Sequence, residues 1–256
     1  MYHVGTNGKG IKLTFGPNVT RIPAYFMLPT DNPNDKAYIT DLVFETKSIR
    51  IAAYGLSYLS VPAVKLPVVT TLSGLGLATN YVAKFIVMND GLINYAAWSL
   101  TDNNKAELIL LGDSINQIAN NTFRNCKKLN TLVIPHIDNP LFDAANMFYN
   151  VTSTVNVYGD SSVEKWVNNV NTTNNTTNII YHDISGYRPT ITSNTGITEE
   201  VGYNGTYQFT ATGNVDIKQY YDASDGKRYY VDADYTKVGN TYTITKIKSD
   251  VYIDIK

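Results

Sequence analysis

Three histidines, His3, His136 and His182, are the side chains best suited to act as bases or metal ligands near neutral pH. They occur at the N-terminus, in a turn after an apolar segment and beside a predicted linker, and none has the spacing of a zinc site. The chain contains no H-E-x-x-H, G-x-S-x-G or phosphate-binding glycine motif. We therefore predict no catalytic residue, no metal ligand, no cofactor and no enzymatic activity.

The single cysteine and a group of aspartates are the remaining candidates for chemistry. Cys126 has no second cysteine to pair with, and its place in a repeat predicts a small buried apolar side chain rather than a nucleophile. Asp222, Asp225, Asp232 and Asp234 could hold calcium, but no D-x-D-x-D-G pattern completes a loop. Solvated acids in hairpins are the favoured interpretation.

Composition limits the partners of the chain. The 256 residues are 43% hydrophobic, enough for a core, and the formal net charge is −1 with no long basic run. This argues against nucleic acid and acidic lipid as partners. The sequence contains no run of 18 apolar residues, so it does not predict a membrane-spanning segment. The N-terminus lacks the features of a signal peptide, so we expect either an excerpt of a secreted protein or another route to the site of action.

A repeated strand pattern must position whatever functional residues exist. Apolar residues recur in an L-x-x-L-x-I-P frame that starts at residues 10, 39, 61, 82, 105, 129 and 152. The intervals of 29, 22, 21, 23, 24 and 23 residues are typical of leucine-rich-repeat solenoids. A Pro- and Asp-rich insertion at 29–36, expected to be a loop, explains the first interval. One unit cannot bury its own apolar face, so the pattern predicts seven stacked coils with a parallel sheet.

Each predicted strand has an outward residue between two inward ones. In the fifth unit, for example, Leu108 and Leu110 are predicted to face inward and Ile109 outward. The outward residues and two charged neighbours form a predicted outer strip that would contact a partner. Its residues are Val43, Lys65, Lys84, Ile86, Glu107, Ile109 and Val133. The alternative is that β-branched residues merely favour strands, without any binding role.

Three short segments carry a resemblance to a known family. These are N-V-T-R-I-P at 18–23, N-T-F-R-N-C at 121–126 and L-N-T-L-V-I-P at 129–135. They resemble the BspA-like leucine-rich repeats of bacterial surface proteins, over roughly residues 11–158. The resemblance implies a leucine-rich-repeat solenoid displayed on a cell surface, where it adheres to a protein or glycan.

A capping helix is predicted near residues 161–170. Asp160 or Ser161 can cap its start, and Val163, Trp166 and Val170 share one face. Trp166 is expected to close the open end of the core, which a terminal repeat requires. The polar segment 171–178 is predicted to be a loop, followed by a last strand that ends a first domain at residues 1–183.

A second domain is predicted at residues 187–256, after a linker at 184–189. Alternating or β-branched segments occur at 206–212, 216–221, 227–232, 241–245 and 251–255. Asp225-Gly226 indicates a two-residue hairpin. The segments predict a small antiparallel β-sandwich, so the whole chain is expected to be mainly β with short helical turns. Its closing hairpin resembles the Ig-like modules of bacterial and phage surface proteins.

Three functions remain in competition. The first is a non-enzymatic binding or adhesion module, extracellular or on the cell surface, with a protein or glycan partner. The second is a virion component, such as a phage tail or receptor-binding protein, which could form a homo-oligomer. The third is an enzyme that acts on polysaccharide through an unrecognised carboxylate pair.

Overall fold

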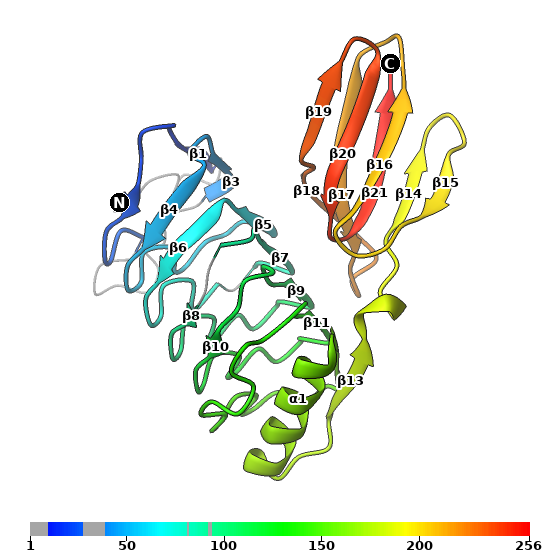
Figure 1. The fold of residues 1–256 in the computed structure, drawn as a ribbon. Helices are drawn as coiled ribbons and strands as arrows, with labels where there is room; N and C mark the ends of the chain where they lie inside the picture. The colour runs from blue at the N-terminus through cyan, green and yellow to red at the C-terminus, as the bar shows by residue number, and fades with distance from the viewer. Residues whose placement is uncertain (1–9, 28–38, 81, 92–93) are drawn as a thin grey trace. The chain divides into compact units, whose positions relative to one another are not determined.

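The computed structural model describes residues 10–27, 39–80, 82–91 and 94–256 (Figure 1). His3 and the predicted loop at 29–36 lie outside the described residues. The chain divides into two compact units, Met1–His182 and Asp183–Lys256.

The first unit is a parallel β-solenoid of about seven turns. One side carries the pair β1–β3 and a six-stranded sheet in the order β13-β12-β11-β9-β7-β5. These strands are β1 (Ile11–Phe15), β3 (Ile39–Phe44), β5 (Ala63–Leu66), β7 (Phe85–Met88), β9 (Leu108–Leu110), β11 (Thr131–Val133), β12 (Val155–Gly159) and β13 (Ile179–Asp183). A second sheet contains β2 (Arg21–Ile22), β4 (Ser48–Ile51), β6 (Val68–Leu72), β8 (Asn94–Tyr95) and β10 (Gln117–Ile118).

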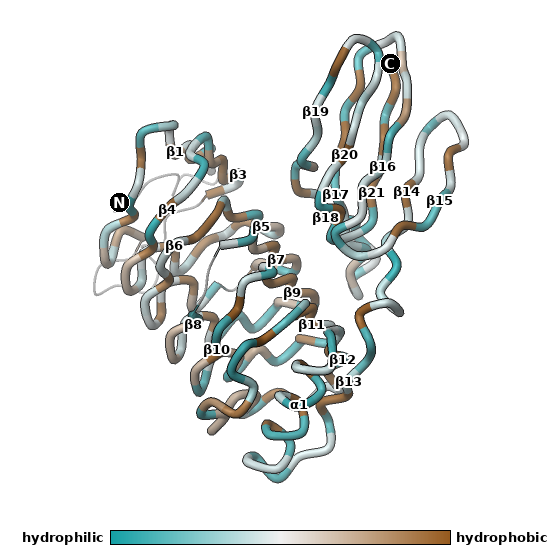
Figure 2. Tube along the Cα trace, viewed as in Figure 1, coloured by the Kyte–Doolittle hydropathy of each residue, from teal (hydrophilic) through white to brown (hydrophobic). Residues whose placement is uncertain are grey.

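The solenoid core is built from ladders of equivalent residues in successive coils. Val64 lies beside Ile86, Ile86 beside Ile109, Ile109 beside Leu132, and Leu132 beside Val157. All five belong to one continuous core cluster. Figure 2 shows the hydrophobic residues that recur along the strands of successive coils. Because each coil packs on its neighbours, the apolar side chains of single units become a shared interior.

The prediction of which strand residues face the core is wrong in the fourth and fifth coils. Ile86 and Ile109 were expected to face outward, yet both are fully buried in the solenoid core. The sequences F-I-V-M and L-I-L-L are apolar on both faces, so alternation cannot fix the frame there. A shift of one residue exchanges the two faces of a strand, and here the pairing with neighbouring coils decides it.

The outer strip consequently does not form a continuous exposed surface. Val133 is buried, and Glu107 is only 2% exposed. Lys84 forms an ion pair with Glu107, with Nζ 3.2 Å from Oε1. Val43 and Lys65 are half-buried. A binding role for these residues stays a prediction, but its geometric premise fails for Ile86 and Ile109.

A third side of the solenoid consists of turns with two left-handed residues per coil, four positions apart. The pairs are Tyr54 and Tyr58, Leu75 and Thr79, Trp98 and Asp102, Asn121 and Asn125, and Asn146 and Asn150. Successive turns are joined by backbone hydrogen bonds, such as that from the Leu75 N–H to the Trp98 carbonyl (3.2 Å). Asparagine tolerates this conformation better than other non-glycine residues, which explains both asparagines of N-T-F-R-N-C.

Helix α1 (Ser161–Asn174) covers the end of the solenoid stack (Figure 1). Asp160 caps it, as the sequence allows, by accepting hydrogen bonds from the Ser162 and Val163 N–H groups. Trp166 is 1% exposed and packs edge-on to Phe148 with ring centroids 6.1 Å apart, so its predicted burial is confirmed.

The predicted loop at 171–178 is wrong in its first half. The helix continues to Asn174, whose side-chain amide donates to the carbonyls of Ala144 (2.9 Å) and Val170 (2.7 Å). Asn175 then ends the helix in the left-handed conformation. The tertiary hydrogen bond to Ala144 thus helps to hold the helix in a segment whose composition favours a loop.

The second unit contains two packed sheets. One has the order β15-β14-β21-β17-β18 and the other β16-β20-β19. Their strands are β14 (Thr190–Ser193), β15 (Thr198–Glu200), β16 (Gly205–Thr210), β17 (Val215–Asp222), β18 (Arg228–Asp232), β19 (Tyr235–Val238), β20 (Thr241–Ile247) and β21 (Asp250–Ile255), after a short 3-10 turn η1 (Ile184–Gly186). Side chains from both sheets form one core cluster. Because β14 pairs with β21 in parallel, the first sheet is mixed rather than purely antiparallel.

The hairpin between β17 and β18 differs from the expected two-residue turn. The strands end at Asp222 and resume at Arg228, so the loop is longer. Asp225 accepts hydrogen bonds from the Lys227 N–H and the Tyr229 hydroxyl, which hold this longer loop. Within the described residues, no helix is long and apolar enough to span a membrane.

Candidate binding surface on the turn side of the solenoid

The left-handed turn residues place large side chains at the surface. Tyr25, Tyr54, Leu75 and Trp98 occupy the same position in successive coils, as the backbone bonds between their turns show. Tyr25 is 57% exposed and Trp98 is 39% exposed. A left-handed non-glycine residue is strained, so an aromatic residue there is a costly choice for the turn itself.

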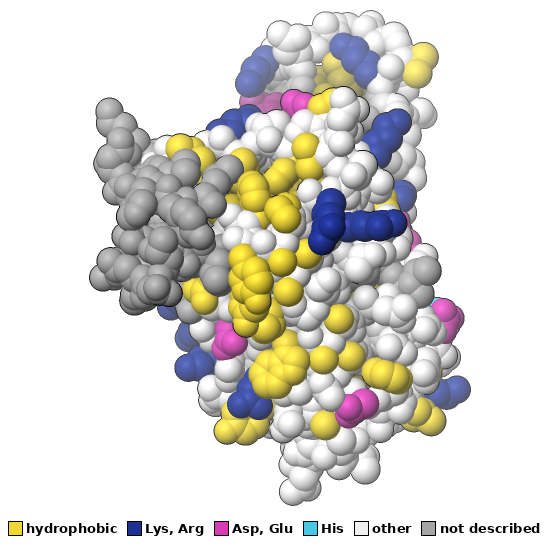
Figure 3. Space-filling view, turned by 90° about the vertical axis from the view of Figure 1, so that its left-hand side faces the viewer, with side chains coloured by type: hydrophobic (Ala, Val, Ile, Leu, Met, Phe, Trp, Pro, Cys, Tyr) yellow, Lys and Arg dark blue, Asp and Glu magenta, His cyan; other side chains and the backbone are white. Residues whose placement is uncertain are grey.

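Ring contacts join these side chains at two places along the solenoid. The Tyr25 and Tyr54 rings stack with centroids 5.3 Å apart. Farther along, the Arg124 guanidinium lies 5.3 Å from the Trp98 ring and 4.1 Å from the Tyr149 ring. We call Tyr25, Tyr54, Trp98, Arg124 and Tyr149 the turn-side strip. Figure 3 shows hydrophobic side chains gathered over this side of the solenoid, with Lys and Arg side chains beside them.

A ladder of polar side chains runs beside the turn-side strip. The Asn125 amide donates to Asp102 (2.6 Å), and the Asn150 amide donates to Asn125 (3.0 Å). These residues occupy the second left-handed position of three successive coils. The ladder fixes the turns and places amide groups next to the aromatic rings.

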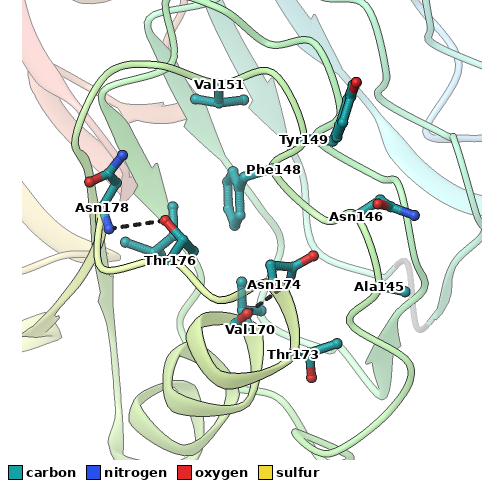
Figure 4. A pocket seen from close by; sticks show the side chains of 11 residues that line it. Ala145, Asn146, Phe148, Tyr149, Val151, Val170, Thr173, Asn174, Thr176 and Asn178 are labelled. Atoms are coloured by element: carbon teal, nitrogen blue, oxygen red, sulfur yellow. Dashed lines mark hydrogen bonds between the residues drawn. The ribbon is translucent and has the colours of Figure 1, made fainter.

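A cavity of about 320 Å³ lies between the last solenoid turn and the C-terminal half of helix α1 (Figure 4). Tyr149 belongs both to its lining and to the turn-side strip. Its other lining residues are Ala145, Asn146, Phe148, Val151, Val170, Thr173, Asn174, Thr176, Asn178 and Ile179. None of these side chains carries a charge.

His136 belongs to a cluster at the start of helix α1. Its Nδ1 is 2.6 Å from Asp160 Oδ2 and 3.2 Å from Ser162 Oγ, and its Nε2 is 3.1 Å from Asp138 Oδ1. This is not a catalytic triad, because the serine and the helix-capping aspartate share one ring nitrogen. The hydrogen bond to Asp160 raises the pKa of His136. Partial burial opposes the shift at Asp160, but hydrogen bonds from Ser162 and His136 lower its pKa.

The other residues considered for chemistry have structural surroundings. Cys126 is fully buried, and its burial raises the pKa of the thiol to about 12, so it stays protonated at neutral pH. Asp222 receives two hydrogen bonds from Arg228, which lower its pKa. Asp232 pairs with Lys218. Within the described residues, no group of three His, Cys, Asp or Glu side chains is arranged to hold a metal ion.

Sequence reasoning missed the turn-side strip. Alternation of apolar and polar residues is readable on the strands, whereas the turns have no such pattern. A signal was present: Tyr25, Tyr54, Leu75 and Trp98 recur at intervals close to those of the strand frame. Large side chains that keep the repeat spacing outside the apolar frame indicate an exposed column.

Comparisons of the chain with protein-family models, with curated proteins and with solved structures give no match. The choice of the turn side as candidate site therefore depends on its geometry.

Proposed function

We propose that the chain is a non-enzymatic binding module, extracellular or on a cell surface, whose turn-side strip holds a glycan chain. The observation that carries the proposal is the set of aromatic rings, three of them exposed, and one arginine on the turns of the solenoid, beside a ladder of amides. The resemblance of residues 121–135 to BspA-like surface repeats, and of the last hairpin to Ig-like modules, supports the same setting.

Sugars match this surface chemically. The C–H face of a pyranose ring packs on an aromatic ring, while its hydroxyl groups require amide and hydroxyl partners. Adjacent coils are about 4.8 Å apart. That distance is close to the length of one sugar residue in an extended polysaccharide, so successive rings of a glycan can meet successive coils.

The same rings could in principle stack on nucleobases. Binding of single-stranded nucleic acid needs a positively charged groove for the phosphates. The turn-side strip has a single cation, Arg124, and the acidic Asp102 lies in the ladder beside it. The chain as a whole has a net charge of −1. A neutral, hydroxyl-rich chain is therefore the favoured ligand.

Trp98→Asn tests the proposal, because asparagine accepts the left-handed backbone that Asn121 and Asn146 adopt at the same position. We expect it to weaken binding to an array of neutral oligosaccharides by about tenfold through loss of ring stacking. Tyr235→Ser, which removes a ring that is 44% exposed in the other unit, is the matched control. Equal binding by both variants and the native chain, or no binding to any glycan, contradicts the proposal.

A further inference from the structure

The cavity at the end of the solenoid has two kinds of wall. Figure 4 shows Phe148 between Asn146 and Tyr149 on one side and Thr176 and Asn178 on the other, with helix α1 below. Phe148 is 7% exposed and is one of the stacked rings that fill the last coil. The floor is thus aromatic and aliphatic, while amides and hydroxyls form the rim.

Two rim amides are unused by the fold. The side chains of Asn146 and Asn178 make no hydrogen bond to another described residue, and both are exposed. Each amide offers two donors and one acceptor oxygen. The side-chain amide of Asn174, in contrast, donates its N–H groups to the carbonyls of Ala144 and Val170. The amides of Asn146 and Asn178 can therefore bind a ligand that both donates and accepts hydrogen bonds.

The absence of charge narrows the ligand class. A pocket that holds a carboxylate or phosphate normally presents Arg, Lys or helix N–H groups. This cavity has no charged lining residue and meets the C-terminal half of α1, where the dipole disfavours anions. Its volume of about 320 Å³ lies at the lower end of the roughly 300–1,000 Å³ of ligand pockets.

We propose that this cavity binds a single neutral pyranose unit, as the terminal subsite of the turn-side strip. The apolar side of the sugar contacts the small exposed part of Phe148 and the Tyr149 ring, which is 54% exposed, and its hydroxyls bond the amides of Asn146 and Asn178. Tyr149, shared by cavity and strip, links the two. The inference rests on the proposed glycan binding. It adds that recognition of the end of the glycan is separable from recognition along its length.

The experiment uses the full chain labelled with ¹⁵N, because side-chain amides give their own NMR signals. The probes are free glucose, galactose, mannose and N-acetylglucosamine, with glucuronate as the charged counterpart. We expect at least one neutral sugar to shift the Asn146 and Asn178 amide signals at millimolar concentration, and glucuronate to bind more weakly. Unmoved signals with all four neutral sugars overturn the subsite.

Asn146→Gly is the decisive variant, because glycine keeps the positive φ while the amide is removed. We expect about tenfold weaker monosaccharide binding, the loss of a ligand hydrogen bond in a pocket. Asn204→Gly is the matched control at another left-handed asparagine, which lies in the C-terminal unit and outside the cavity lining and the turn-side strip. Equal weakening by both variants overturns the subsite.

The two proposals fail in distinguishable ways. If Trp98→Asn leaves oligosaccharide binding unchanged while a monosaccharide still shifts Asn146, the strip is wrong and the subsite stands. If Trp98→Asn weakens binding to oligosaccharides and no monosaccharide shifts the cavity amides, the strip stands and the subsite is wrong.

Discussion

The solenoid and the C-terminal unit both expose aromatic rings but organise them differently. In the C-terminal unit, Tyr230 tilts against Tyr220 at 6.3 Å and Tyr235 against Tyr242 at 6.0 Å, so each exposed ring packs on a neighbour across its own sheet. In the solenoid, Tyr25, Tyr54 and Trp98 hold equivalent positions in different coils, and Arg124 joins the rings of Trp98 and Tyr149. A repeat fold therefore converts a local residue choice into an elongated surface, which a small sandwich does not.

The largest expected effect tests the core of the solenoid. Ile109→Ala should lower the free energy of unfolding by about 2–5 kcal/mol, because Ile109 is fully buried in a core ladder. Both tryptophans, Trp98 and Trp166, lie in this unit, so urea unfolding followed by tryptophan fluorescence reports on it. Ile253→Ala, the equivalent change in the C-terminal core, is the matched comparison. A change below about 0.5 kcal/mol for Ile109→Ala would restore the outward assignment.

A smaller effect tests the left-handed turns that carry the strip. Asn125→Ala should be about 1 kcal/mol less stable than Asn125→Gly, because a Cβ strains the backbone at φ +59°. At Asn214 in the C-terminal unit, where φ is not positive, the order should reverse in favour of alanine. Urea midpoints of the four variants measure both orders. The same order at both sites contradicts a special role for the solenoid turns.

The smallest expected effect is a dependence on pH. The raised pKa of His136 stabilises the fold fully below its ordinary value near 6.5, and this contribution is lost as pH rises through the raised value. The lowered pKa of Asp160 stabilises above about 3.8 and is lost as pH falls. The pair therefore contributes most between these limits. His136→Gln should remove the loss of stability on the neutral side of that window, as urea midpoints across pH would show.

The C-terminal unit offers the comparison for this prediction. Its Asp222–Arg228 pair lowers the pKa of Asp222, so its contribution falls only in acid and has no counterpart near neutrality. Near pH 7, the stability of Asp222→Asn should depend on pH as much as that of the native chain. If His136→Gln still loses stability as pH rises toward neutrality, that loss belongs to another titrating group.

The sequence predicts the repeat and the cap of the solenoid well, because both depend on strong local signals. The apolar interval near 23 residues reveals the coils, and Asp160 followed by Val163, Trp166 and Val170 reveals α1. The inward faces of β7 and β9 could not be predicted in the same way. Ile86 and Ile109 have apolar neighbours on both sides, so only their pairing with other coils decides which residues enter the core.

The candidate site was less accessible to sequence reasoning. Trp98 and Tyr149 lie 51 positions apart in the sequence, and only the stacking of coils brings both rings onto Arg124. The cavity requires the helix to continue to Asn174, against the composition of that segment. Both features arise from tertiary contacts and could not be derived from a local pattern.

The backbone ladder between turns has a consequence for how such a chain can evolve. Each coil is bonded to the coils beside it, as Trp98 is to Asn120 and Asn121 to Ala145. Tandem duplication of the segment 105–128 would thus insert a coil whose edges already fit, and lengthen the surface by one step of about 4.8 Å. The length of the solenoid then becomes a heritable trait that changes in whole coils through recombination, without any new residue having to arise by point mutation.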